Sequence, residues 1–390
     1  MANRTMTPAE RMKTALNHSE PDRVPLDLGS TKMTGINLTA YKKYIAYKGW
    51  EELDSCSSIL DPVQRLAVVH EEVLKRLCVD TRGLLPVTPS NFKTEYREID
   101  GNTVFTDEWG VEWKMPAVGG QYFDMVSHPL AGELGMSDLG HFPWPDPLDD
   151  KRIAGFAGRL IELKKQGDYA FVMHGVSAGI FEMSLRLRGF EQLFMGFILE
   201  PELVCGILDR IVEIKAAYWQ KALDKVGKDI LVAIEADDLG TQSSLLISPE
   251  IYRKYIKPRH KKLFSLIKEK APHIKVFLHC CGAVKPLIPD LIEAGVDILN
   301  PIQVSANNMD TKVLKKEYGD VLIFWGGGVD TQRVLPFGSP WEVREEVKRR
   351  IDDLAPGGGF VFNTIHNIQA DVPPENIEAM LETLEKYGKY

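Results

Sequence analysis

Short apolar runs alternate along the chain with longer segments whose apolar residues recur at helical spacing. The runs are apolar throughout, a pattern typical of parallel strands covered by helices on both faces. Eight such units predict a (β/α)8 barrel of the TIM type, with a doubly wound open sheet as the alternative. The eight predicted strands are residues 23–29, 79–87, 170–175, 230–236, 274–279, 297–301, 321–326 and 359–363.

Amphipathic periodicity predicts helices between these strands, at residues 63–77, 201–226 and 248–270. A short helix is also expected over residues 7–17. Thr7 is its N-cap candidate, Pro8 fits the first turn, and Glu10 completes a capping box.

Residues 94–115 break this rhythm. Polar and apolar residues alternate there, and Asp100-Gly101 and Trp109-Gly110 are turn sequences, so the segment predicts a β-meander. We place it in an insertion of about residues 90–150 after the second strand, on the rim of the barrel. The whole chain, residues 1–390, is then expected to form one barrel domain with this insertion.

Composition narrows the class of protein. Lys and Arg number 47 against 55 Asp and Glu, a formal net charge of −8 without a long basic run, so nucleic acid is not an expected partner. The five cysteines are odd in number and two are adjacent, which favours reduced thiols over disulfides. With no apolar stretch of spanning length and no leader-like start, a cytoplasmic enzyme is expected.

The strongest chemical signal is His279-Cys280-Cys281-Gly282, directly after the predicted strand 274–279. Active sites of TIM barrels lie at the carboxyl ends of the strands. Side chains alternate along an extended chain, so His279 and Cys281 face the same way and Cys280 faces another. An imidazole beside a thiolate suits Zn²⁺. A nucleophilic cysteine paired with histidine, or a buried cysteine pair, are the alternatives.

Three further groups fall at predicted strand ends. His366 follows the last strand and becomes a candidate third metal ligand. Glu235, Asp237 and Asp238 form a carboxylate cluster, in which capping explains one member and Glu235 is a candidate fourth ligand or base. The loop with Gly327 and Asp330 permits close backbone approach and is a candidate cofactor-binding loop.

Three polar residues lie on other predicted strands. Asp80 and Arg82 lie on the second, and His174 ends the third. Substrate contact or a structural role is expected for each, in preference to metal ligation.

Several segments together resemble the uroporphyrinogen decarboxylase superfamily, and most closely its branch of zinc-dependent, corrinoid-linked methyltransferases. The resemblance is carried by HCCG at 279–282 and by the stretches at residues 10–29, 235–263, 324–332 and 370–380. It implies a (β/α)8 barrel, in agreement with the strand count.

The resemblance also implies site residues. The branch's zinc-binding His-x-Cys falls on His279 and Cys281, and the position of its distant cysteine is His366 here. Asp80 falls where decarboxylases have their catalytic aspartate. The stretch Ser30–Gly35, which matches their arginine-rich substrate clamp, contains Lys32 but no arginine.

The expected activity is zinc-dependent transfer of a methyl group between a small molecule and a corrinoid carried by a partner protein. A methyl ether or similar donor is favoured over a thiol. The alternatives are a decarboxylase that uses Asp80, or a non-catalytic ligand-binding barrel. We leave a homodimer open.

Overall fold

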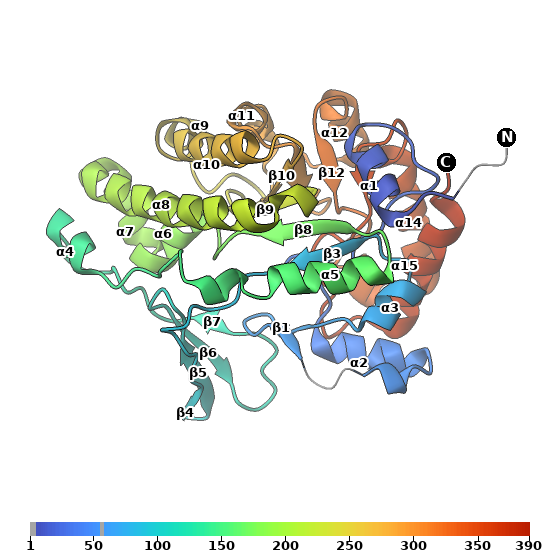
Figure 1. The fold of residues 1–390 in the computed structure, drawn as a ribbon, viewed down its shortest axis with the longest axis horizontal. Helices are drawn as coiled ribbons and strands as arrows, with labels where there is room; N and C mark the ends of the chain where they lie inside the picture. Colours follow the sequence, from blue (N-terminus) through green and yellow to red (C-terminus); the bar gives the residue numbers. More distant parts are fainter. Residues whose placement is uncertain (1–4, 55–57) are drawn as a thin grey trace.

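The computed structural model describes residues 5–54 and 58–390. Its centre is a seven-stranded parallel sheet in which neighbouring strands follow chain order (Figure 1). β3 pairs directly with β8, because the strands between them in the sequence, β4 to β7, form a separate sheet. The strands are β3 (Thr81–Leu84), β8 (Ala170–His174), β9 (Val232–Ala236), β10 (Lys275–His279), β11 (Ile298–Asn300), β12 (Ile323–Trp325) and β13 (Phe360–Val361).

The predicted first strand, residues 23–29, is not a regular strand. Its backbone nevertheless reaches both edges of the sheet, since Asp27 N donates to Phe362 O and Asp80 N donates to Leu26 O. Pro25 has no N–H to offer a sheet ladder, and the segment forms isolated bridges in place of a ladder: Leu26 to Phe362, parallel, and Arg23 to Lys389, antiparallel. The segment therefore takes the place of the eighth strand in a TIM-like barrel.

Helices cover the outside of this sheet (Figure 1). Thr7 caps the first helix in a capping box with Glu10, as predicted, and the predicted helix 201–226 is confirmed. The α-helices are α1 (Pro8–Leu16), α2 (Leu38–Tyr47), α3 (Glu71–Arg76), α4 (Met136–His141), α5 (Phe156–Gln166), α6 (Ile180–Arg188), α7 (Phe190–Leu199), α8 (Pro201–Val226), α9 (Pro249–Ile251), α10 (Lys257–Lys270), α11 (Ile288–Ala294), α12 (Thr311–Tyr318), α13 (Val334–Phe337), α14 (Pro340–Leu354) and α15 (Pro374–Tyr387). A π-helical turn, Tyr252–Ile256, joins α9 to α10 within the predicted helix 248–270.

The predicted helix 63–77 is wrong in its first half. A small hairpin, β1 (Ile59–Asp61) with β2 (Leu66–Ala67), occupies that part, and α3 starts only after His70. The Asp61 carboxylate accepts hydrogen bonds from the backbone N–H groups of Val63 and Gln64, and Arg65 has a positive φ of 53°. These turn interactions compete with the helix that the apolar spacing favours.

Two buried layers result from the alternation of side chains along the strands. Strand residues such as Val172, Val232, Ile234 and Phe277 form the interior cluster, together with Met12 and Leu16 of α1. Because Ala9 N donates to Asp168 O, just before β8 begins, α1 closes the amino end of the barrel. The carboxyl end is left for a site.

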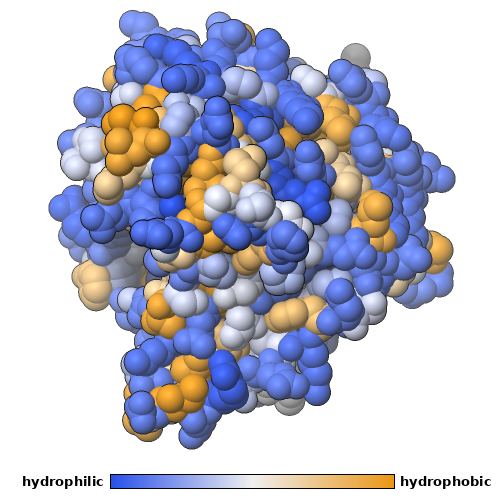
Figure 2. Space-filling view, turned by 90° about the vertical axis from the view of Figure 1, so that its left-hand side faces the viewer, coloured by the Kyte–Doolittle hydropathy of each residue, from blue (hydrophilic) through white to orange (hydrophobic). Residues whose placement is uncertain are grey.

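The insertion forms a separate antiparallel sheet, which projects from the lower part of the molecule in Figures 1 and 2. Its order is β4-β5-β6-β7, so it extends past the predicted meander 94–115. The strands are β4 (Arg97–Ile99), β5 (Asn102–Thr106), β6 (Glu112–Pro116) and β7 (Asp124–Met125).

Figure 2 looks onto this side of the molecule, where apolar side chains lie scattered among hydrophilic ones. Among the helices of residues 5–54 and 58–390, none combines the length and apolar character needed to cross a membrane.

Candidate metal centre

His279 ends β10, and Cys281 follows two residues later. Phe277 belongs to the interior of the barrel, so alternation brings His279 and Cys281 to the same side at its carboxyl end. Cys280 is fully buried on the other side, among the residues between sheet and helices. The predicted difference in direction between the two adjacent cysteines is therefore present.

The His279 ring is held in place by a hydrogen bond at Nδ1, on the side of the ring away from Cys281. Its Nδ1 lies 2.5 Å from the side-chain oxygen of Asn300, the last residue of β11, and the Asn300 amide nitrogen donates to Trp325 O at 2.7 Å. Because Asn300 presents an acceptor, the neutral form of the ring carries its proton on Nδ1 and has its lone pair on Nε2. That Nε2 faces Cys281 Sγ at 3.3 Å.

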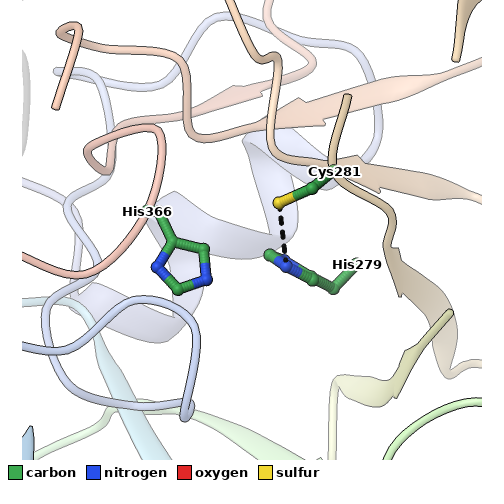
Figure 3. A group of neighbouring side chains, drawn as sticks. All are labelled: His279, Cys281 and His366. Carbon is green, nitrogen blue, oxygen red and sulfur yellow. Dashed lines mark hydrogen bonds between the residues drawn. The ribbon is translucent and has the colours of Figure 1, made fainter. Parts of the chain in front are cut away.

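His366 reaches the same point from the loop after β13. Figure 3 shows its ring facing His279 and Cys281 across a small gap, and the two imidazole centroids are 5.4 Å apart. One donor atom from each of the three residues lies within 4.8 Å of the others. Burial, followed by the nearby charge of His279, lowers the pKa of His366 to about 3, so its ring is neutral and a lone pair is available.

These donors fit a zinc ion. A tetrahedral zinc with bonds of about 2.0–2.3 Å holds its ligand atoms roughly 3.3–3.6 Å apart. The separation of His279 Nε2 and Cys281 Sγ already falls there, and because the three donor atoms lie within 4.8 Å of one another, His366 needs a shift of at most about 1.5 Å to join them. Burial, with the Asp238 charge, raises the pKa of the Cys281 thiol, which counts against a metal-free nucleophilic cysteine.

Asp238 is a site residue whose role was not visible in the sequence. Its Oδ1 accepts the backbone N–H of Cys281 at 2.8 Å and lies 3.9 Å from His279 Nε2. Its neighbour Asp237 instead caps α6, accepting from the N–H groups of Phe181 and Glu182, and contacts His260 at 2.9 Å. The expectation that capping explains one of the clustered carboxylates therefore fits Asp237.

A cavity of about 550 Å³ opens above this cluster. Barrel residues His174, Asp238, His279 and His366 line its floor, and the insertion supplies aromatic residues to its wall. The insertion thus lies at the carboxyl end of the barrel, as predicted for a rim segment. A small molecule in this cavity reaches His279 and His366 directly, and Cys281 Sγ lies 3.3 Å from His279 Nε2.

Glu235 points away from the cluster and contacts other side chains, so the structure gives no support to a role as fourth ligand or free base. Its neighbour Ile234 faces the interior, so Glu235 faces α8, where Lys215 Nζ lies 2.9 Å from Oε2 and Trp219 Nε1 donates to Oε1 at 2.6 Å. Burial raises the pKa of Glu235, and the Lys215 charge opposes this shift. The residue borders the cavity as part of a buried ion pair.

Asp80 lies at the opposite end of the barrel. It precedes β3 and is fully buried, with Arg11 Nη1 at 2.6 Å, Arg23 Nη1 at 2.9 Å and the backbone N–H of Leu26 at 2.8 Å. Its carboxylate joins the amino-terminal helix to the barrel. This position gives no support to a catalytic role.

In the loop with Gly327 and Asp330, both residues contact neighbouring parts of the protein. Gly327 has a φ of +84°, and a Cβ there would approach Ile302 Cβ to 2.8 Å. Asp330 is buried and accepts the backbone N–H groups of Gln332 and Arg333. Neither residue borders the described cavity, so the predicted cofactor contacts find no support here.

Comparison with known proteins agrees with this architecture. The model of the family described as "Uroporphyrinogen decarboxylase (URO-D)" matches residues 124–387. The chain belongs to this family. The match contains β8 through β13 and all three candidate metal ligands.

Individual relatives are distant. A methylated-thiol–coenzyme M methyltransferase of Methanosarcina mazei is 25% identical over 62% of this chain and 61% of its own length. A uroporphyrinogen decarboxylase of Alkalilimnicola ehrlichii is 24% identical over 68% of this chain and 69% of its own. The solved structure of a methyltransferase from Methanosarcina mazei superposes with a TM-score of 0.64 at 18% identity, covering 98% of this chain and 99% of that one, which shows a shared fold.

Proposed function

We propose that this protein is a zinc-dependent methyltransferase that moves a methyl group between a small molecule and a corrinoid carried by a partner protein. The observation that carries the proposal is the cluster of His279, Cys281 and His366, of which the two histidines line a cavity of about 550 Å³. Three protein ligands with an open fourth position are the arrangement of catalytic zinc sites. The distant similarity to a methyltransferase supports the direction of this proposal.

The donor set favours one kind of chemistry. Two neutral imidazoles and one thiolate leave a zinc site with a net charge of +1, and zinc there acts as a Lewis acid on the heteroatom that carries the methyl group. A second thiolate would make the site neutral and more suited to a thiolate nucleophile. We therefore favour a methyl ether or similar donor over methylation of a thiol.

The surrounding residues supply the positioning. Asn300 holds the His279 ring so that Nε2 faces the cavity side of the cluster. Asp238 fixes the backbone of Cys281 and brings a carboxylate within 3.9 Å of His279, where it can orient a bound water or a substrate proton. The insertion contributes Phe92, Phe105, Trp109 and Trp113 to the lining of the cavity, so part of the surface around the reacting groups is apolar.

A porphyrinogen with several carboxylates fits this cavity less well. Its lining arginines are Arg152 and Arg186, and each already pairs with a glutamate, Glu108 and Glu182 respectively. Asp80 lies at the other end of the barrel. We therefore expect no decarboxylation of uroporphyrinogen, and formation of coproporphyrinogen at enzyme-like rates would contradict this.

Metal analysis followed by a transfer assay tests the proposal. We expect about one zinc per chain and zinc-dependent methylation of cob(I)alamin by a methyl ether, followed by the change in cobalamin absorbance. Cys281→Ala should remove both zinc and activity, while Cys280→Ala serves as the matched control and keeps both. A zinc-free chain, or one in which methyl transfer is insensitive to removal of zinc, would contradict the proposal.

A further inference from the structure

His174 is a buried group in the cavity that the proposed chemistry leaves without a role. It ends β8, two residues after the inward-facing Val172, and only 6% of the residue is exposed. Its Nε2 is buried and finds no hydrogen-bond partner in the described part of the chain. Of the described residues that line the cavity, it is the one with such an orphaned side-chain nitrogen or oxygen.

A buried polar atom without a partner is unfavourable and rare in folded proteins, so a bound molecule is expected to satisfy it. Burial, helped by the charges of Lys32, Lys215 and His279, lowers the pKa of His174 to about 3. The ring is therefore neutral at physiological pH. A neutral imidazole recognises an uncharged hydrogen-bonding group and does not require a carboxylate or phosphate.

The wall above His174 is aromatic. Phe92, Phe105, Trp109 and Trp113 all border the cavity, and all come from one stretch of the insertion. Trp113 is fixed by a 2.9 Å hydrogen bond from Nε1 to Asp107, and the Arg186 guanidinium lies 5.1 Å from its ring centroid. Fixed rings at the edge of a cavity favour a flat aromatic ligand.

The side-chain charges around the cavity disfavour a strongly anionic ligand. Three cations line it among the described residues, and each is paired: Lys32 with Asp61 at 3.6 Å, Arg186 with Glu182 at 2.6 Å, and Arg152 with Glu108. Asp107 and Asp238 also border the cavity, and no lysine or arginine of the described residues forms an ion pair with either. An anion would have to break one of these pairs.

We propose that the methyl donor is an uncharged aromatic methyl ether, whose ring lies against the wall of residues 92–113 and whose polar group hydrogen-bonds to His174 Nε2. This inference rests on the proposed function. In the transfer, the methyl C–O bond breaks and the oxygen keeps its electron pair, leaving as an aryloxide that takes a proton from water. The methyl carbon bonds to cobalt of the partner's corrinoid, which supplies the electron pair and is oxidised from Co(I) to Co(III).

Calorimetric titration of the zinc-loaded protein tests the donor class. The probes are 2-methoxyphenol as the uncharged ring, 2-methoxybenzoate as its anionic analogue, and dimethyl sulfide as a small aliphatic methyl donor. We expect 2-methoxyphenol to bind at least about tenfold tighter than either of the others, a difference that one matched hydrogen bond and an aromatic contact can provide. Equal or tighter binding of dimethyl sulfide or 2-methoxybenzoate would overturn the inference.

Two pairs of variants test the named contacts. His174→Phe should weaken 2-methoxyphenol binding about tenfold or more, while His174→Gln, whose amide reaches the position of Nε2, should restore most of the affinity. Phe92→Ala, at a half-buried wall residue, should also weaken binding, and Tyr122→Ala, at a 57% exposed residue of the same insertion, should not. If His174→Phe, His174→Gln and Phe92→Ala all bind the ring like the unmodified protein, the placement is wrong.

Zinc content separates failure of this inference from failure of the proposed function. If zinc binds and dimethyl sulfide methylates cob(I)alamin while 2-methoxyphenol does not, the aromatic donor is refuted and the methyltransferase proposal stands. If the zinc-loaded protein transfers methyl from none of the three probes although 2-methoxyphenol binds, the ring site stands and the proposed function fails.

Discussion

The side-chain oxygen of Asn300 lies 2.5 Å from Nδ1 of His279, so the residue that ends β11 orients a candidate metal ligand at the end of the neighbouring strand β10. Removing such a partner lowers metal affinity by roughly 10- to 100-fold in known sites. We expect Asn300→Ala to have an effect of this size in a competition titration with a zinc chelator. Asn300→Asp keeps the acceptor and should lose less; equal losses would contradict the orienting role.

The adjacent cysteines should behave oppositely. Cys281→Ala removes a sulfur ligand and should abolish stoichiometric zinc, as measured by elemental analysis. Cys280→Ala truncates a fully buried side chain outside the cluster, so it should keep zinc and cost about 1 kcal/mol of unfolding free energy. Zinc retained by the first variant and lost by the second would show that the facing of the two side chains is reversed.

His366 should complete a first shell of two nitrogens and one sulfur. X-ray absorption should find zinc–nitrogen distances near about 2.0–2.1 Å and zinc–sulfur near about 2.3 Å. His366→Ala should weaken zinc binding and remove activity, whereas His366→Cys should keep zinc and make the site more electron-rich. In His366→Cys, the rate of methyl transfer from ether donors should then fall more than the rate of transfer to thiol acceptors. A shell with two sulfurs in the unmodified protein, or one unchanged by His366→Ala, would rule this ligand out.

Asp80 should matter for stability and not for chemistry. Asp80→Asn leaves Arg11 and Arg23 without their buried carboxylate, and breaking such a pair costs about 3–5 kcal/mol of unfolding free energy. Urea unfolding checks this, with Asp150→Asn at a 95% exposed side chain as the control near zero. A folded Asp80→Asn protein that binds zinc normally but has lost all methyl transfer would restore a catalytic role.

Lys315 makes a prediction about alkaline pH. Burial lowers its pKa from 10.5 to about 8, despite the opposing charges of Asp320 and Glu20. Between these two pH values the unfolded chain holds a proton that the folded chain has released, so the unfolding free energy rises with pH across this window. Lys315→Met should flatten that rise in urea titrations at pH 8 and pH 10, and Met at the exposed neighbour Lys316 should not.

Local patterns predicted the elements that depend on near neighbours in the chain. The capping box at Thr7, the span of α8 and the turn-rich insertion all follow from contacts within a few residues. Alternation along β10 also predicted that His279 and Cys281 share a side, because one strand fixes both.

Long-range partners explain what the sequence did not reveal. Glu235 directly follows Ile234, which faces the barrel interior, so a shift of one residue in the predicted strand would turn Glu235 inward. Only its ion pair with Lys215 on α8 shows that it faces the helices. The catalytic role of Asp80 was implied only by the resemblance to decarboxylases, and its position at the amino end of the barrel depends on Arg11 and Arg23, which are distant in the chain. The role of Asp238 depends on Cys281, 43 residues further along the chain.

The wall of the cavity and its floor come from different parts of the chain. The insertion supplies the aromatic wall and contributes no strand to the parallel sheet, whereas the candidate metal ligands come from the barrel. Selection can therefore alter residues 92–125 without disturbing the ends of β10 and β13. If the proposed function holds, exchange of this segment between relatives should change which donor is accepted while leaving the bond that is broken the same.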